Sequence, residues 1–171
     1  KLALPGGRAA TPGKAANFKE KAMNPSKKIA VVTGASSGIG SVYADRLARR
    51  GYDLLLVARR HDRLQSLAAK LEQAYGIKAE TLVADLEKED DLARLETILA
   101  DNPAIRVLVN NAGMARLSPV AETPAKNSLS QIALNITALT RLTHAVLPAF
   151  KERNDGVIIN IASVLAVHVL P

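Results

Sequence analysis

The sequence has no cysteine and no tryptophan, and aromatic residues occupy only 3% of its 171 positions. Without cysteine, neither a disulfide framework nor thiolate chemistry can underlie the fold or the function. So few aromatic rings argue against a surface on which nucleic-acid bases stack. No apolar run is long enough to cross a bilayer, so we expect no membrane segment and a cytoplasmic location.

The composition that remains is typical of a soluble globular domain, with 48% hydrophobic and 23% charged residues. The length allows one domain with a substantial core. The formal net charge is +7, but residues 1–22 hold five basic side chains against one acid and so carry +4 of it. In the other residues acids and bases are interspersed, so we expect no nucleic-acid partner.

The N-terminal segment 1–24 is rich in Ala, Gly, Pro and Lys and has no sustained periodicity. This composition predicts a disordered leader, separate from a folded domain over 25–171. The segment lacks the apolar core of a secretory signal. We expect Met23 to be the natural start of the protein.

From residue 28 onward, short apolar runs alternate with stretches of helical spacing. The expected strands are 28–33, 53–58, 78–84, 105–110 and 156–163. The expected helices are about 39–50, 62–75, 88–100 and 125–151. A left-handed Gly51 is expected to cap the first, Gly76 to end the second and Pro148 to kink or end the last. Such alternation predicts an α/β protein with a doubly wound parallel sheet between two helical layers, in strand order 3-2-1-4-5. Ligands then bind at the carboxyl ends of the strands.

The stretch 28–43 reads KIAVVTGASSGIGSVY, an apolar strand, a glycine-rich turn and the start of a helix. The first turn of a helix carries unpaired N–H groups and the positive end of the dipole, which suit a phosphate group. Glycines would let the backbone approach such a group, and serine hydroxyls would add donors. The candidate binding residues are Thr33, Gly34, Ser36, Ser37, Gly38, Ile39 and Gly40. The alternative is a glycine-rich turn that binds nothing.

Two further patterns follow apolar strands. Asp85 and Leu86 come directly after the third strand, where Asp85 could either contact a nucleotide or cap the next helix. The fourth strand ends in Asn110 followed by Asn111, Ala112 and Gly113. Asparagine tolerates turn geometry, and the small residues let the chain pass close to a bound nucleotide.

Together, the T-G-x-x-x-G-x-G pattern and the following N-N-A-G resemble the short-chain dehydrogenase/reductase family of NAD(P)-dependent oxidoreductases over about 28–171. The resemblance implies a Rossmann-type fold and hydride transfer between a cofactor and a small-molecule carbonyl or alcohol. It also implies that Asp85 binds the adenine amine, that Ser163 is the catalytic serine, and that Asn135 holds a water in a proton relay. The full-length protein is then expected to be a homo-oligomer.

Arg59 and Arg60 end the second strand, where an acidic residue would select NAD by binding its 2′-hydroxyl. Guanidinium groups instead suit the 2′-phosphate of NADP. The pair therefore predicts that NADP(H) is preferred over NAD(H). The alternative is an ordinary solvated basic pair at a strand end.

The family's Tyr-x-x-x-Lys pair is not found before Pro171, since none of the three tyrosines has a lysine four positions later. The C-terminal part of the fold therefore looks to be missing, and we expect the chain alone to be a fragment that is not a competent reductase. Residues 156–163 would then form an aggregation-prone sheet edge, and cofactor binding would be weak.

Two other classes of function compete with the reductase. The first is a non-catalytic nucleotide-binding module or sensor, and the second is a nucleic-acid binder that uses the basic leader. Turnover of carbonyl compounds would separate the reductase from the first. His61, His144 and His168 have no metal-ligand spacing, so we expect no metal site.

Overall fold

The computed structural model describes residues 28–115 and 118–164, and the expected leader lies outside them. Five parallel strands form one sheet in the order β3-β2-β1-β4-β5, which confirms the predicted topology. The strands are β1 (Ile29–Thr33), β2 (Asp53–Ala58), β3 (Ala79–Val83), β4 (Ile105–Asn110) and β5 (Val157–Asn160).

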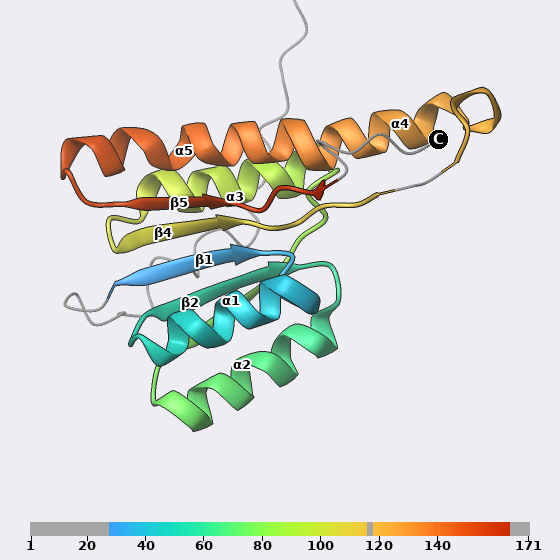
Figure 1. The fold of residues 1–171 in the computed structure, drawn as a ribbon. Coiled ribbons are helices and arrows are strands. Elements are labelled where there is room, and N and C mark those ends of the chain that lie inside the picture. Colours follow the sequence, from blue (N-terminus) through green and yellow to red (C-terminus); the bar gives the residue numbers. More distant parts are fainter. Residues whose placement is uncertain (1–27, 116–117, 165–171) are drawn as a thin grey trace, which may run out of the picture.

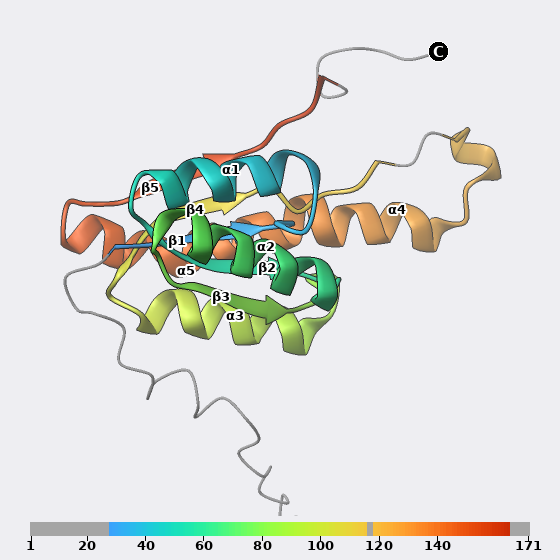
Figure 2. The same cartoon turned by 90° about the horizontal axis from the view of Figure 1, so that it is seen from below.

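Helices cover both faces of the sheet, as predicted. Figure 1 shows α3 (Glu89–Asp101) and α5 (Leu139–Glu152) on one face, and α1 (Gly38–Arg49) and α2 (His61–Tyr75) on the other. In Figure 2, seen from below, α1 and α2 lie in front of the sheet. Every residue of β1 and β2 is buried, because both strands are covered on two faces. Alternate residues of β1, such as Ala30 and Val31, therefore join two separate hydrophobic clusters.

Two helix ends use glycine as predicted. Gly51 follows α1 with φ of 83°, and Gly76 caps α2 with φ of 64°, both in the left-handed region that glycine adopts without steric cost. The start of α2 differs from the prediction by one residue, since the helix begins at His61 and Asp62 lies in its first turn.

The long helix expected over 125–151 is three segments. α4 (Ala125–Ile132) leads into a π-helical segment, η3 (Ala133–Ala138), and then into α5. In both views α4 extends beyond the ends of the strands. Pro148 lies inside α5 and does not end it, because the helix continues to Glu152. None of the helices in the described part of the chain is long and apolar enough to cross a membrane.

The last strand is shorter than the predicted 156–163. Within the described residues β5 pairs with β4 alone, and β4 ends at Asn110, which lies opposite Asn160. One more backbone bond, from the N–H of Ile161 to the carbonyl of Asn110, closes the ladder at 2.9 Å. Beyond that point β4 offers β5 no further partner, so Ser163 lies past the strand rather than at its end.

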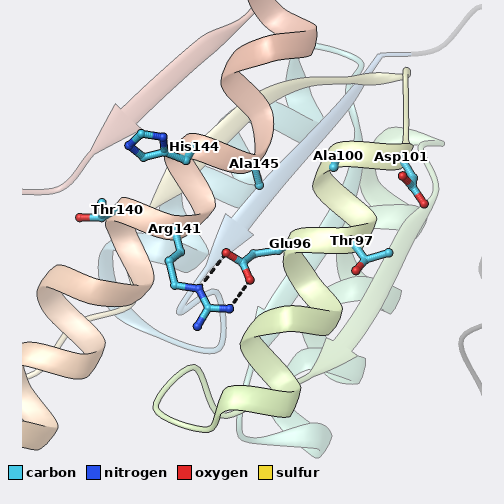
Figure 3. Close-up of a pocket in the computed structure, with 8 residues that line it drawn as sticks. All are labelled: Glu96, Thr97, Ala100, Asp101, Thr140, Arg141, His144 and Ala145. Atoms are coloured by element: carbon cyan, nitrogen blue, oxygen red, sulfur yellow. Dashed lines mark hydrogen bonds and ion pairs between the residues drawn. The ribbon is translucent and has the colours of Figure 1, made fainter. Parts of the chain in front are cut away.

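Arg141 of α5 joins α5 to α3. Its Nε donates to Glu96 Oε1 at 2.8 Å and its Nη2 donates to Glu96 Oε2, while its Nη1 donates to Glu89 Oε2 at 2.6 Å. Figure 3 shows the Arg141–Glu96 pair in a groove between the two helices. The hydrogen bond from Arg141 lowers the pKa of Glu89 below its usual value of 4.5.

We expect this ion pair to make stability depend on pH in the acid range. A carboxylate whose pKa is lower in the folded state contributes stability above its unfolded pKa and loses it as the pH falls through the folded pKa. Arg141→Met should therefore be slightly less stable than the unmutated protein at pH 7, and this difference should disappear as the pH falls below about 4.5 and Glu89 becomes protonated. Urea unfolding from pH 7 to pH 3 measures this. Arg63→Met, at an exposed position, is the control for the change in charge, and an identical pH profile for Arg141→Met and the unmutated protein would contradict the expectation.

Candidate functional site

At the carboxyl edge of the sheet, Thr33 joins the ends of β1 and β4. Its hydroxyl donates to the carbonyl of Val109 at 3.1 Å and accepts the backbone N–H groups of Asn111 and Ala112, each at 3.0 Å. Thr33 is 1% exposed, so its bond to Val109 is buried, while the bonds from Asn111 and Ala112 are partly buried. The threonine of the T-G pattern thus fixes the course of the chain after β4.

Asn111, which follows β4, makes a second connection to the end of β1. Its side-chain amide donates to the carbonyls of Thr33 and Gly34 at 2.9 and 3.3 Å. A Cβ added to Gly34 or Gly40 would lie 2.8 or 2.5 Å from the Asn111 Nδ2 atom. These two glycines are therefore required by contacts within the protein, whereas the sequence suggested that they make room for a ligand.

Gly38 differs from the other two glycines of the turn. It has φ of 57°, and a Cβ there would meet no atom within 4 Å. It opens α1 after the extended N-cap residue Ser37, whose side chain makes no capping hydrogen bond, and the first turn of α1 contains no acidic residue. The positive end of the helix therefore faces open space with its N–H groups available, which is the arrangement that binds a phosphate group. The side chain of Ile39, 57% exposed, lies beside it.

The two arginines after β2 have different partners. Arg60 lies against the glycine-rich turn, where its Nη2 donates to Ser36 Oγ at 3.1 Å and to Ser37 Oγ at 2.7 Å. Arg59 instead pairs with Glu87, with 3.6 Å between Nη1 and Oε1. Of the two arginines, only Arg60 therefore contacts the glycine-rich turn directly. The exposed Arg59 lies on the side of β3.

The structure decides one alternative for Asp85. The N-cap of α3 is Lys88, so Asp85 does not cap that helix. Asp85 Oδ1 accepts the N–H of Glu87 at 3.3 Å, and the N–H of Asp85 donates to Asp91 Oδ2 at 2.9 Å. Leu86 is 5% exposed and packs in the core, so its side chain is not available to a ligand.

Asn135, in the middle of η3, uses both ends of its side-chain amide. Its Nδ2 donates to the carbonyl of Met114 at 2.7 Å, and its Oδ1 accepts the Met114 N–H at 2.9 Å. The side chain thus holds the segment that follows β4. A Cβ added to Gly113 would lie 3.3 Å from the same Oδ1, so Gly113 allows this close approach.

Ser163 is exposed and follows β5, the neighbour of β4 in the sheet. The ends of these two strands are joined by Asn110, whose amide donates to Asn160 Oδ1 at 3.0 Å and to Thr143 Oγ1 at 3.1 Å. The arrangement brings Thr33, the glycine-rich turn, Arg60 and Asn111 together at the carboxyl edge. Ser163 belongs to the same edge through its strand.

Sequence reasoning missed several residues of this region, namely Glu87, Met114, Ser130, Thr143 and Asn160. The sequence could have pointed to Glu87, because it lies two residues after the candidate binding residue Asp85. The contacts of Ser130 and Thr143 depend on how α4 and α5 pack, which no local pattern contains. Among the described residues, no group of three or more metal-binding side chains comes together.

Comparison with known proteins gives three concordant results. Residues 28–171 match the family model described as short chain dehydrogenase. A very-long-chain 3-oxoacyl-CoA reductase-B of Danio rerio is 36% identical over 148 residues, which cover 84% of this chain and 47% of the relative. A structure of a short-chain dehydrogenase from Sphingobium yanoikuyae in complex with NADPH has a TM-score of 0.80 and 47% identity, over 82% of this chain and 55% of that one.

A second solved structure, the bulky-bulky ketone specific alcohol dehydrogenase from Comamonas testosteroni, has a TM-score of 0.80 and 41% identity. The match covers 82% of this chain and 56% of that protein. The chain therefore spans about half the length of the relatives that it matches.

Proposed function

Because this chain belongs to the short chain dehydrogenase family, we propose that it forms part of an NADP(H)-preferring oxidoreductase. This enzyme interconverts a ketone and an alcohol. The observation that carries the proposal is the open N-terminus of α1, which has no acidic residue in its first turn and is flanked by Arg60. This end suits a pyrophosphate, and a neighbouring guanidinium suits a 2′-phosphate. When bound, the cofactor supplies or accepts the hydride.

The residues of this chain have separate tasks in the proposal. The first-turn N–H groups of α1 bind the pyrophosphate, and Arg59 and Arg60 bind the 2′-phosphate. The Asp85 carboxylate accepts a hydrogen bond from the adenine amine. The Ser163 hydroxyl donates to the substrate oxygen and stabilises the charge that develops there. Asn135 fixes the segment after β4, which forms the wall of the site, and takes part in the proton relay.

The names of the relatives suggest the substrate class to test. They act on 3-oxoacyl-CoA compounds or bulky ketones by name, so we propose a ketone with a large substituent. Assays of the full-length protein with NADPH would compare a 3-oxoacyl thioester, a diaryl ketone and a small aldehyde. Cofactor binding without turnover of any of them would favour the non-catalytic module. The proposal includes a cytoplasmic location and a homo-oligomeric state, tested by cell fractionation and by size-exclusion chromatography with light scattering.

The cofactor preference gives a direct test by mutation. Losing a hydrogen-bonded charge pair costs about 1.5–3 kcal/mol, or roughly 10- to 150-fold in affinity. Arg59→Ala combined with Arg60→Ala should therefore remove most of the preference for NADPH over NADH, measured by cofactor fluorescence titration. Arg63→Ala combined with Lys70→Ala, at exposed positions of α2, removes the same charge and should leave the preference intact. Equal affinities of the unmutated protein for the two cofactors would refute the proposal.

A further inference from the structure

The carboxylate of Glu87 lies between two elements that are distant in sequence. Its Oε1 is 3.6 Å from Arg59 Nη1, at the end of β2, and its Oε2 accepts a hydrogen bond from Ser130 Oγ of α4. The Glu87 side chain is 23% exposed, whereas that of Arg59 is 63% exposed. The carboxylate is thus the more buried and better anchored partner of this ion pair.

The anchoring of Glu87 extends through α4. Ser130 Oγ also lies 3.6 Å from the sulfur of Met114, whose backbone is held by Asn135. A carboxylate held in this way cannot swing freely into solvent when a second anion approaches Arg59. Arg59 must then divide its positive charge between Glu87 and that anion.

We infer that Glu87 is a specificity-determining residue that lowers the preference for NADP(H), because its carboxylate competes with the 2′-phosphate for Arg59. This inference rests on the proposed function. A phosphate monoester carries about 1.5 to 2 negative charges at pH 7, so it is repelled by Glu87 and must share Arg59 with it. The neutral 2′-hydroxyl of NAD(H) meets neither penalty. Glu87 therefore affects one cofactor and leaves the other unchanged.

Arg60 explains why a preference for NADP(H) is retained in the presence of Glu87. Its hydrogen-bond partners are the neutral hydroxyls of Ser36 and Ser37, so it can turn its charge towards a phosphate without breaking an ion pair. The two arginines then have unequal roles. Arg60 supplies the main contact with the 2′-phosphate. Glu87 determines how much Arg59 adds to the affinity for that phosphate.

The test compares Glu87→Gln with the unmutated full-length protein in titrations with NADPH and NADH. The amide keeps the size of the side chain and its contact with Ser130 but removes the charge. We expect NADPH to bind about two- to fivefold more tightly, the effect typical of a partly exposed ion pair, with NADH affinity unchanged. Glu152→Gln, at the far end of α5, is the control for net charge and should change neither affinity.

A second variant tests whether the effect passes through Arg59. In the Arg59→Ala background, Glu87→Gln should give little or no gain in NADPH affinity; a gain as large as in the parent would overturn the competition. An unchanged or lower ratio of NADPH to NADH affinity in Glu87→Gln, with an unaltered melting temperature, would also overturn it. Failure of the unmutated protein to bind NADPH at all would instead refute the proposed function together with the inference, so the two failures are distinguishable.

Discussion

Replacing Thr33 with valine should lower the free energy of unfolding by about 2 to 6 kcal/mol. Valine has nearly the shape of threonine, so the packing of the 1% exposed site is kept. The substitution nevertheless leaves the N–H groups of Asn111 and Ala112 without the oxygen that now accepts both. Both donors are partly buried, and a donor shielded from water costs about 1–3 kcal/mol when it loses its partner. The loss is large for a domain whose total stability is about 5–15 kcal/mol.

Chemical denaturation of the purified variant measures the effect, and Thr33→Ser is the matched control. Serine keeps the hydroxyl and loses only a methyl group, so it should cost about 1 kcal/mol. Nucleotide affinity should follow the same order, because the Asn111 segment lies against the glycine-rich turn. If valine were tolerated as well as serine, the hydroxyl would not be the element that joins β1 to β4.

Gly40→Ala should weaken cofactor binding by about a hundredfold. The new Cβ would lie 2.5 Å from the carbonyl oxygen of Gly34 and 2.9 Å from its carbonyl carbon, and neither backbone atom can rotate away as a flexible side chain could. The turn must therefore open and move the first N–H groups of α1. Losing a hydrogen bond to the charged pyrophosphate costs about 1.5–3 kcal/mol, which is on the order of a hundredfold in affinity at its upper end.

Isothermal titration with NADPH gives the affinity, and thermal unfolding separates it from stability, which should fall by about 1–3 kcal/mol through overpacking. Gly51→Ala, just beyond the other end of α1, is the control. An added Cβ there meets nothing within 4 Å, but φ of 83° makes alanine strained, by about 1–2 kcal/mol. Gly51→Ala should thus lose stability and keep its affinity. Equal affinity losses in the two variants would show that general destabilisation, and not the turn, determines binding.

The topology was predictable from the sequence because it depends on local patterns. Fully apolar runs such as residues 53–58 mark strands that are buried on both faces, and the alternation with helical spacing leaves few arrangements for a parallel sheet. The carboxyl edge then follows from chain direction alone. This is why the region around Thr33, Gly38 and Asn111 could be expected at one place.

The details that escaped prediction depend on contacts between segments distant in sequence. The need for glycine at positions 34 and 40 comes partly from Asn111, more than 70 residues away. The different partners of Arg59 and Arg60 depend on where Glu87 and the serines of the turn come to lie. The π-helical segment around Asn135 has no signature in the spacing of apolar residues, and the early end of β5 is set by its partner β4.

The hydrogen bonds between Thr33 and Asn111 also have a consequence for the order of folding. These hydrogen bonds join residues 78 positions apart, with three helices and three strands of the chain between them. β1 can pair with β2 much earlier, since Ile29 and Asp53 lie opposite each other. Closing the longer loop costs more entropy, so we expect the docking of β4, and with it the nucleotide-binding turn, to come late on the refolding pathway. A nucleotide that requires the completed turn should then leave the refolding rate unchanged and act by slowing the unfolding of the native protein.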